Sequence, residues 1–541
     1  MHSLCHYFET RLVLPDYKAL CSHMYPLAAR GTMPPAQPPL LTAFKLFDEE
    51  ILSYAFGGQF THWLRFCMTC KDAHKLGRQV PFRAELTFAR GVPYAGMIAG
   101  LNLQTMQPRQ ANHLALMLSN LSIYVYIEPS MISSLATLLK NAAGTLQALH
   151  LEHTACSSAQ LSELFASIQK CTKMTDLHFG ELAPKYFAAQ GNAVSSTFAS
   201  LASLGIGMCE LSAQDMQNLV GFIESSQNLH TLAFEYTTLP QAGFDALATA
   251  LYSVPLLQTL TLKNVMTDNW NLEALASALS QLSQLKSFNI HGCHMQPAHA
   301  CTLFEAMHGL TQLETLALRS NKLGSLGAQA LARALPNLPE IRNLYCASAS
   351  LCAGDVREFF SAIPTGNLRR LELNNNKIGE QGGKALTEAL KSFTLLESVG
   401  LRHCKIGAKQ TRELVVAMGR HCRPRKLDLY DNNLGDEGAG KVMQTLSSYP
   451  GLVSLDTGSN QIGESGVREI ASLLPCFSGL HTFILSHNII NQASARALTA
   501  ALDQCSSLKF VDLSSPSLSR EAHTHFSDCT YALELYYDIH P

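Results

Sequence analysis

The stretch Leu368–Leu390, LRRLELNNNKIGEQGGKALTEAL, decides the fold. Leu371 and Leu373 alternate with polar neighbours, which predicts a short strand with one buried face. Asn376 and Gly379 follow in a turn, where an amide can bond to the backbone and glycine relieves strain. Small residues and leucines then recur at helical spacing to the end of the stretch, which predicts an amphipathic helix. One strand, one turn and one helix therefore make up one unit.

The unit recurs at a nearly fixed spacing. We call its second leucine-type residue, Leu371 in this stretch, the anchor position. Fifteen anchor positions occur, at Leu121, Leu149, Leu177, Leu204, Leu232, Leu260, Phe288, Leu316, Leu344, Leu371, Val399, Leu427, Leu455, Phe483 and Val511. Twelve of the fourteen intervals are 28 residues and two are 27. This register predicts stacked units, because no single unit can bury its own leucines.

The units resemble ribonuclease-inhibitor-type leucine-rich repeats, which NOD-like receptors, tropomodulins and the Ran GTPase-activating protein share. The resemblance begins near Leu114 and is specific for the fold rather than for a function. It implies an α/β leucine-rich repeat solenoid, a horseshoe with an inner parallel β-sheet and outer α-helices. A small α-helical N-terminal segment is expected to precede it. Helices are wider than strands, which bends the stack with the sheet inside.

The fifth residue after the anchor position is often an asparagine that can bond to neighbouring turns. This holds for Asn321, Asn376, Asn432, Asn460 and Asn488. Cysteine takes this place at Cys209, Cys293 and Cys404, and the chain has sixteen cysteines. Many of the others lie in helical parts of different units, too far apart to pair. We therefore expect reduced thiols, which favours a cytosolic compartment.

Composition and charge limit the classes of partner. The 541 residues carry a net charge of −2, and 47% of them are hydrophobic. A nearly neutral chain favours neither a nucleic acid nor an anionic membrane. No apolar run is long enough to span a bilayer, and the first residues lack the apolar core of a signal peptide. We expect a soluble cytoplasmic protein that does not use the general secretory route.

The segment Phe44–Leu76 predicts two short helices separated by a glycine pair. The segment resembles an F-box, and the matching residues are Glu50, Ile51, Leu52, Leu64, Cys70 and Lys71. The resemblance implies that these residues bind the Skp adaptor of a cullin–RING ubiquitin ligase, so that the repeats would select substrates.

Two residues of this segment depart from the F-box pattern. Asp48 stands where the family has proline, and Ala73 stands where it has tryptophan. The alternative interpretation is an N-terminal helical cap that shields the first repeat. Bacterial effectors also carry leucine-rich repeats and F-box-like helices, so the host cytosol is the expected compartment if the chain is a secreted effector.

Four parts of the chain are expected. These are an N-terminal arm with a Pro-rich linker at 1–40, a helical segment that is F-box-like or a cap at 41–80, an array of about fifteen repeats at 81–515, and a C-terminal cap at 516–541.

Signals for catalysis or a cofactor are weak. Cys67 and Cys70 form the only C-x-x-C, without the second pair that a zinc site needs. Four residues lie on or beside adjacent predicted strands: His150, Glu152, His153 and His178. Two interpretations remain for them, a transition-metal site and a solvated histidine patch. Lys384 is followed by alanine, so no phosphate loop is present. We expect no enzyme and no cofactor.

The concave face of the sheet is the predicted protein-binding surface, at positions one, three and four after the anchors. Its candidates are His150, Glu152, His178, Glu235, Tyr236, Lys263, His291, Arg319, Tyr345, Glu372, Arg402, Asp428, Tyr430 and Asp456. Tyrosine and arginine are typical interface anchors, although any single residue here is also ordinary solvated surface. We therefore expect a protein-interaction scaffold. The alternatives are a NOD-like or inhibitor-type regulator with no ubiquitin link, and a GTPase-activating solenoid.

Overall fold

The computed structural model describes most of the repeat region. The described residues are 82–86, 118–127, 129–154, 157–190, 200–267, 272–422, 424–515 and 534–536. The chain divides into two compact units, Met1–Leu229 (unit 1) and His230–Pro541 (unit 2). The F-box-like segment and the Cys67–Cys70 pair lie outside the described residues, so the domain bounds predicted there stay predictions.

The described residues of unit 1 form five parallel strands paired in sequence order. They are β1 (Phe82–Leu86), β2 (Leu118–Ile127), β3 (Ala148–Thr154), β4 (Asp176–Phe179) and β5 (Ser203–Gly207). The helices are α9 (Pro129–Asn141), α10 (Ser158–Ile168), α11 (Ala183–Gln190) and α12 (Ala213–Ser225). Each of these helices follows a strand, as the repeat pattern predicts.

Unit 2 repeats the same alternation. Its strands are β6 (Thr231–Glu235), β8 (Thr259–Lys263), β10 (Ser287–His291), β11 (Thr315–Ala317), β12 (Asn343–Tyr345), β13 (Arg370–Glu372), β14 (Ser398–Gly400), β15 (Lys426–Asp428), β16 (Ser454–Asp456), β17 (Thr482–Ile484), β18 (Phe510–Asp512) and β19 (Glu534–Tyr536). Its helices are α13 (Gln241–Ala250), α14 (Glu273–Leu279), α15 (Pro297–Glu305), α16 (Gly324–Ala334), α17 (Val356–Ala362), α18 (Gly379–Leu390), α19 (Ala408–His421), α20 (Gly435–Leu446), α21 (Glu464–Leu473) and α22 (Gln492–Leu502).

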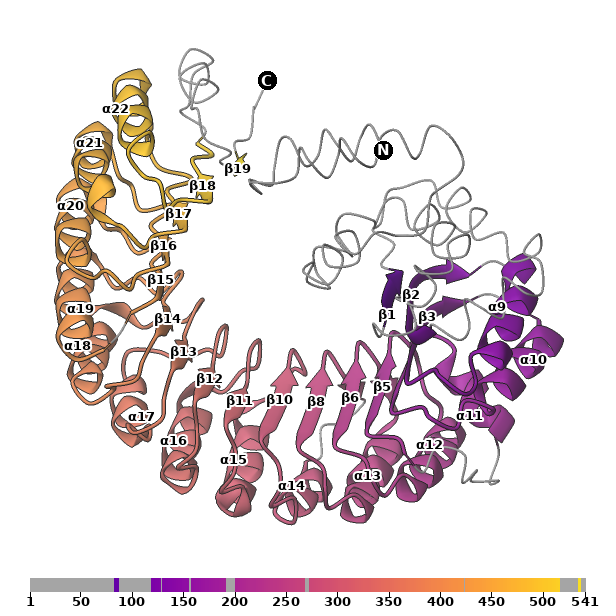
Figure 1. Cartoon of the computed structure of the whole chain (residues 1–541). Coiled ribbons are helices and arrows are strands. Elements are labelled where there is room, and N and C mark those ends of the chain that lie inside the picture. Colours follow the sequence, from indigo (N-terminus) through magenta and orange to yellow (C-terminus); the bar gives the residue numbers. More distant parts are fainter. Residues whose placement is uncertain are drawn as a thin grey trace, which may run out of the picture. The chain divides into compact units, whose positions relative to one another are not determined.

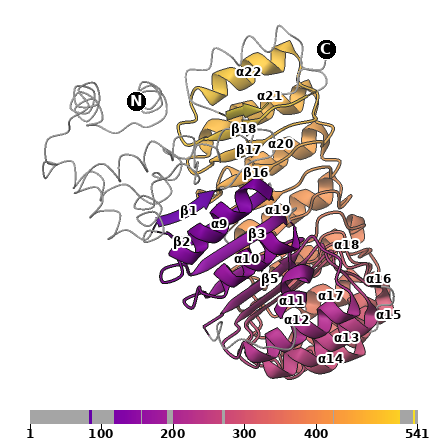
Figure 2. The same ribbon diagram turned by 90° about the vertical axis from the view of Figure 1, so that its right-hand side faces the viewer.

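Within unit 2, the strands line the inner side of an arc and the helices form its outer layer (Figure 1). The helices α13 to α22 stand beside one another in that layer (Figure 2). A separate two-stranded sheet joins β7 (Thr238–Leu239) and β9 (Met266–Thr267). The segment predicted as a C-terminal cap contributes β19, which pairs with β18 in parallel. The predicted fold class, a solenoid of parallel strands alternating with helices, is confirmed.

The register of the sheet follows the anchor positions. Leu371 pairs with Leu344 on one side and with Val399 on the other. Each of these side chains is at most 1% exposed, because it points away from the inner face and into the layer between strands and helices. Burial of this leucine row is the main stabilising term of the array.

The predicted asparagine contacts form a ladder between neighbouring units. Asn460 Oδ1 accepts from the backbone N–H of Asn432 at 2.9 Å, and Asn460 Nδ2 donates to the Leu429 carbonyl at 2.8 Å. Asn488 Oδ1 accepts in turn from the backbone N–H of Asn460 at 2.9 Å. Cys404 replaces the amide with a thiol that donates to the Leu373 carbonyl at 3.3 Å. The amides therefore satisfy buried backbone groups that have no sheet partner.

The fourth residue after the anchor adopts a left-handed backbone conformation in eleven units. Its φ lies between 48° and 63° at Met208, Tyr236, Asn264, Gly292, Ser320, Ser348, Asn375, His403, Asp431, Ser459 and His487. This conformation ends the strand and turns the chain toward the outer layer. It favours glycine, asparagine, aspartate and histidine, so a tyrosine there, such as Tyr236, is held at a cost in backbone energy.

Candidate functional site

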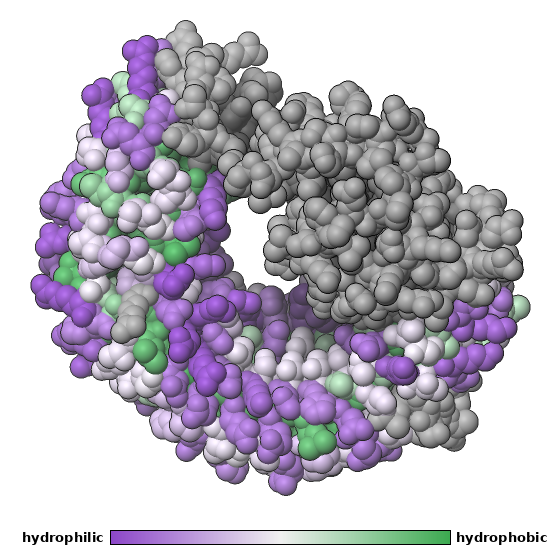
Figure 3. Space-filling model, in the orientation of Figure 1, coloured by the Kyte–Doolittle hydropathy of each residue, from purple (hydrophilic) through white to green (hydrophobic). Residues whose placement is uncertain are grey.

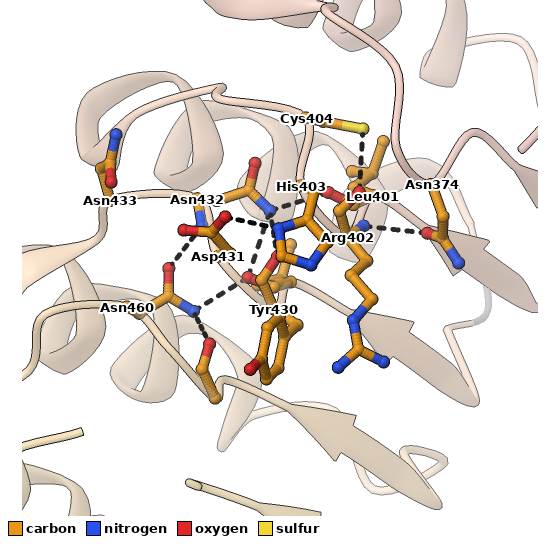
Figure 4. Close-up of polar contacts among 12 residues, drawn as sticks. Asn374, Leu401, Arg402, His403, Cys404, Tyr430, Asp431, Asn432, Asn433 and Asn460 are labelled. Carbon is orange, nitrogen blue, oxygen red and sulfur yellow. Dashed lines mark hydrogen bonds and ion pairs between the residues drawn. The ribbon is translucent and has the colours of Figure 1, made fainter. Parts of the chain in front are cut away.

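Two arginine–tyrosine stacks lie on the inner face of unit 2. Arg402 Cζ is 3.8 Å from the centre of the Tyr430 ring, and Figure 4 shows the two side chains next to each other. Arg319 Cζ is 4.2 Å from the centre of the Tyr345 ring. All four side chains are partly exposed. A guanidinium on an aromatic face is attracted by the ring, so each stack holds two large side chains in a fixed position.

Ion pairs and rings surround these stacks. Arg319 also forms an ion pair with Glu372, whose strand lies two units further along. His403 pairs with Asp431, and its ring centre is 5.2 Å from that of Tyr430 (Figure 4). These contacts restrict the side chains although they are partly exposed.

A recess of about 280 Å³ opens on the same inner face. Its lining comes from β12 to β17 and comprises Tyr345, Arg370, Leu371, Glu372, Asn374, Ser398, Val399, Gly400, Lys426, Leu427, Asp428, Ser454, Asp456 and Ile484. Gly400 forms part of the lining, and its lack of a side chain lets Asn374 pack against the backbone. A Cβ at Gly400 would lie only 2.7 Å from Asn374 Oδ1. That same Oδ1 accepts from the Arg402 backbone N–H at 2.8 Å.

Two carboxylates of the recess are perturbed. Asp428 and Asp456 are register partners on β15 and β16. Burial raises the pKa of Asp428, although the Tyr430 backbone N–H and Arg402 oppose this change. Burial raises the pKa of Asp456 to about 7, and the Asp428 and Asp512 carboxylates add to the effect. Near neutral pH, the Asp456 carboxyl group is therefore partly protonated.

The other predicted residues of unit 2 lie on the neighbouring inner strands. Lys263 Nζ is 3.2 Å from Glu235 Oε2 and lies 5.1 Å from the centre of the Tyr236 ring. Burial lowers the pKa of His291, and the cations Arg319 and Lys263 lower it further. Charges of both signs therefore also occur on the inner strands outside the recess.

In unit 1, the structure brings His150 and His178 together, with ring centres 5.7 Å apart. His150 Nε2 is 3.4 Å from Asp176 Oδ1, so a carboxylate joins the histidine pair. Glu152 lies in β3, but its side chain is not among those described. Within the described ranges, no group of three or more His, Cys, Asp or Glu residues could hold a metal ion.

One predicted residue, Asp456, differs from expectation. It was expected as an exposed concave-face residue, and its side chain is only 8% exposed. Instead of extending outward, the carboxylate turns back and accepts from the Gly458 backbone N–H at 2.9 Å. The side chain still belongs to the recess, so the prediction was right about the face and wrong about the exposure.

Several residues of the recess were missed in the sequence. Arg370 and Lys426 precede their anchors by one residue and, by the same period of two, belong to the inner face. Asp512 does not line the recess, but it follows Val511 by one residue, as Asp456 follows Leu455, and its charge raises the pKa of Asp456. Alternation along the strand was therefore a sufficient signal for all three. The packing of the Asn374 side chain against Gly400 could not be predicted from this alternation.

The cysteines add no reactive group to this site. The ten cysteines in the described part of the chain are free thiols. Burial raises the pKa of Cys404 to about 12, so this thiol stays protonated. Separately, no helix among the described residues is long and apolar enough to cross a membrane.

Comparison with known proteins identifies the repeats. A family model described as Leucine Rich repeat matches residues 309–332, 367–386 and 425–443. The ribonuclease inhibitor of Sus scrofa is 27% identical over 308 residues, which cover 56% of this chain and 61% of that protein. The human NACHT, LRR and PYD domains-containing protein 14 is 28% identical over 226 residues, covering 41% of this chain and 20% of that protein. The chain thus spans about three fifths of the porcine inhibitor and less of the human protein.

Two solved structures are also similar. The complex of Rad7 and Elc1 in yeast matches with a TM-score of 0.44 and 13% identity, over 90% of this chain and 97% of that chain. The complex of TLR13 with ssRNA13 matches with a TM-score of 0.37 and 16% identity, over 80% of this chain and 60% of that chain. The repeat register and the asparagine ladder agree with these sequence matches, which support leucine-rich repeats of the ribonuclease-inhibitor type.

Proposed function

We propose that this protein is a non-enzymatic interaction scaffold that binds a protein ligand on the inner, concave face of its repeats. The observation that carries this proposal is the pair of arginine–tyrosine stacks, Arg319 on Tyr345 and Arg402 on Tyr430. Tyrosine and arginine are the residues that most often dominate the binding energy of protein interfaces. Here they are partly exposed and fixed on neighbouring strands of one rigid sheet.

Rigid placement supports tight binding, because little side-chain freedom remains to be lost when a ligand arrives. The charges around the stacks have both signs, with Arg370 and Lys426 beside Glu372 and Asp428. Such a mixture complements a folded protein surface better than a uniform polyanion. The face of unit 2 that Figure 3 shows is mainly hydrophilic, with hydrophobic residues scattered across it.

The double substitution Arg402→Ala with Tyr430→Ala is expected to weaken ligand binding at least about tenfold, since removing one hot-spot residue costs roughly 2 kcal/mol or more. Binding is measured by affinity capture from cells followed by quantitative mass spectrometry. The matched control replaces Lys391 and Arg468 by alanine, two exposed cations at α18 and in α21 on the outer layer. Partners retained equally by both variants would contradict an inner-face site.

The second part of the proposal concerns Phe44–Leu76. We propose that this segment docks the Skp adaptor of a cullin–RING ubiquitin ligase and that the repeats present a substrate. The support is the sequence match at Glu50-Ile51-Leu52 and at Leu64, Cys70 and Lys71. In a host cell, the same activity would suit a bacterial effector.

Co-purification with the Skp adaptor is expected for the full chain and is expected to be lost with Leu52→Asp plus Leu64→Asp. Each aspartate would place a charge in the apolar contact with the adaptor, where it would lose its water without gaining a partner. Gln59→Ala with Asp72→Ala, in the same segment but outside the matching positions, should co-purify normally. Failure of the unmodified chain to bind would remove the ubiquitin link and leave the cap interpretation.

An inhibitor-type regulator without a ubiquitin link is the second candidate function. Its support is the identity with the ribonuclease inhibitors of Sus scrofa and Mus musculus, 27% and 25%. Both candidates use the inner face, so adaptor binding is the observation that separates them. No residue in the described ranges singles out a GTPase-activating site.

A further inference from the structure

Asp428 and Asp456 are incompletely satisfied. Asp428 Oδ1 accepts from the Tyr430 backbone N–H at 3.1 Å, and Asp456 Oδ1 accepts from that of Gly458 at 2.9 Å. In the described part of the chain, neither Oδ2 atom has a hydrogen-bond partner, and no cation lies within 4 Å of either carboxylate. Asp456 is nonetheless 92% buried, since 8% of it is exposed. Neither Oδ2 atom is among the buried side-chain atoms that lack a partner, so both remain accessible for an incoming donor.

Both carboxylates border the recess, so an incoming group can reach them. The volume of about 280 Å³ is at the lower end of ligand pockets, which span roughly 300–1,000 Å³. Ile484 is the register partner of Asp456 on β17 and offers an apolar wall. The recess therefore combines a pair of acceptors with an apolar surface beside them, which is the shape complement of a long side chain with a polar head.

The charged and titratable groups around the pair are already engaged elsewhere or lie at the edge. Glu372 is paired with Arg319, and Arg402 is stacked on Tyr430. Asp512 accepts from the Ser514 backbone N–H and hydroxyl. His403 is paired with Asp431, and both Arg370 and Lys426 are solvent-exposed on the neighbouring strands. Arg402 favours the ionised form of both carboxylates without contacting them.

Asp428 and Asp456 are register partners on adjacent strands, whose backbones lie about 5 Å apart, and their carboxylates repel one another. Their burial in a low-dielectric recess strengthens this repulsion. A single cation placed between them removes the repulsion and supplies donors for both free oxygens. A guanidinium does this best, because its planar fork donates several hydrogen bonds in fixed directions.

We propose that the recess receives a basic side chain of the protein ligand, with its guanidinium or ammonium group between Asp428 and Asp456 and its methylene stem against Ile484. The inference rests on the proposed inner-face function and names the chemistry of the partner at that site. It assigns Asp428 and Asp456 as the specificity-determining pair for an arginine or a lysine.

The assignment has a consequence for pH. Asp456 has a pKa of about 7 in the free protein, so a substantial fraction carries a proton at neutral pH. A bound cation favours the ionised carboxylate, and binding therefore releases protons. The affinity for a cationic probe is expected to rise between pH 6 and pH 8, by up to about tenfold per proton released per pH unit.

The test uses the full chain and the probe N-acetyl-arginine methylamide, titrated by ligand-observed NMR at pH 6, 7 and 8. The matched probe is the citrulline analogue, which has the same shape without the charge. Asp428→Asn and Asp456→Asn are compared with Glu388→Gln, which removes an exposed carboxylate from the outer helix α18. Far-UV circular dichroism verifies that each variant is folded.

The expected result is saturable binding of the arginine probe, at least about tenfold weaker binding of the citrulline probe, and loss of this preference in both asparagine variants but not in Glu388→Gln. Equal binding of the two probes, no binding of either, or an unchanged preference in both asparagine variants would overturn the assignment. Partner capture that depends on Arg402 and Tyr430 is measured separately, so the inner-face proposal can hold when this assignment fails.

Discussion

Leu371→Asp is expected to unfold the repeats around β13, with a loss of about 4 kcal/mol or more in the free energy of unfolding. Leu371 is 1% exposed and lies between Leu344 and Val399 in the anchor row. The substitution removes its apolar contacts and places a carboxylate where no donor or cation is available. Urea unfolding followed by far-UV circular dichroism measures the loss.

The matched control is Ser398→Asp, which introduces the same carboxylate on β14 one residue from the anchor. Ser398 is partly exposed on the inner face and lines the recess with Arg370 and Lys426. Its substitution is expected to change stability by less than about 1 kcal/mol, as is usual for surface positions. An equal loss in the two variants would show that the assigned strand faces are wrong.

Asp456→Asn is expected to stabilise the protein at pH 8. The folded-state pKa of Asp456 is about 7, above the unfolded value of about 3.9. Between these two values the folded state binds the proton more tightly, so the stability of the unmodified protein falls as the pH rises from 4 to 7. Each pKa unit corresponds to about 1.4 kcal/mol, and the expected gain at pH 8 is about 2–4 kcal/mol.

The gain should shrink as the pH falls toward 4 and vanish near pH 3, where the carboxyl group is largely protonated in both states. Asparagine keeps an oxygen that can accept from the Gly458 backbone N–H, so the turn survives the change. Asp428→Asn is expected to act in the same direction, because its pKa is also raised. Urea midpoints are compared from pH 3 to pH 8. If the Asp456→Asn variant is less stable than the unmodified protein at pH 8, favourable interactions in the folded state must stabilise the charged carboxylate, and the prediction is wrong.

The fold was predictable because its signals are local and repeated. Leu371 and its counterparts recur at intervals of 28 or 27 residues. One unit with a clear sequence pattern therefore sets the register of all the others. Asn460 and Asn488 could likewise be placed in the ladder, because a buried turn needs side-chain partners for its backbone. Each of these inferences depends on the backbone pattern alone.

The site was less predictable because it depends on side-chain conformations. The spacing of 28 residues placed Arg402 beside Tyr430, but not the stacking of one on the other. Arg319 pairs with Glu372 across the strand of Tyr345, a contact between units that are not neighbours. The burial of Asp456 arises from a turn that folds the carboxylate back on its own strand. No residue pattern specifies these choices.

The asparagine ladder has an unequal distribution along unit 2. It is continuous through Asn432, Asn460 and Asn488, where the backbone N–H groups of Asn432 and Asn460 each donate to the side-chain amide of the next asparagine. Val265 and Ala349 occupy the same place in other units and have no polar atom with which to continue it. Cooperativity between neighbours is therefore strongest toward the end of the array. Thermal fluctuations would open the stack in segments, at the units of Val265 and Ala349, while the turns from Asn432 to Asn488 stay closed.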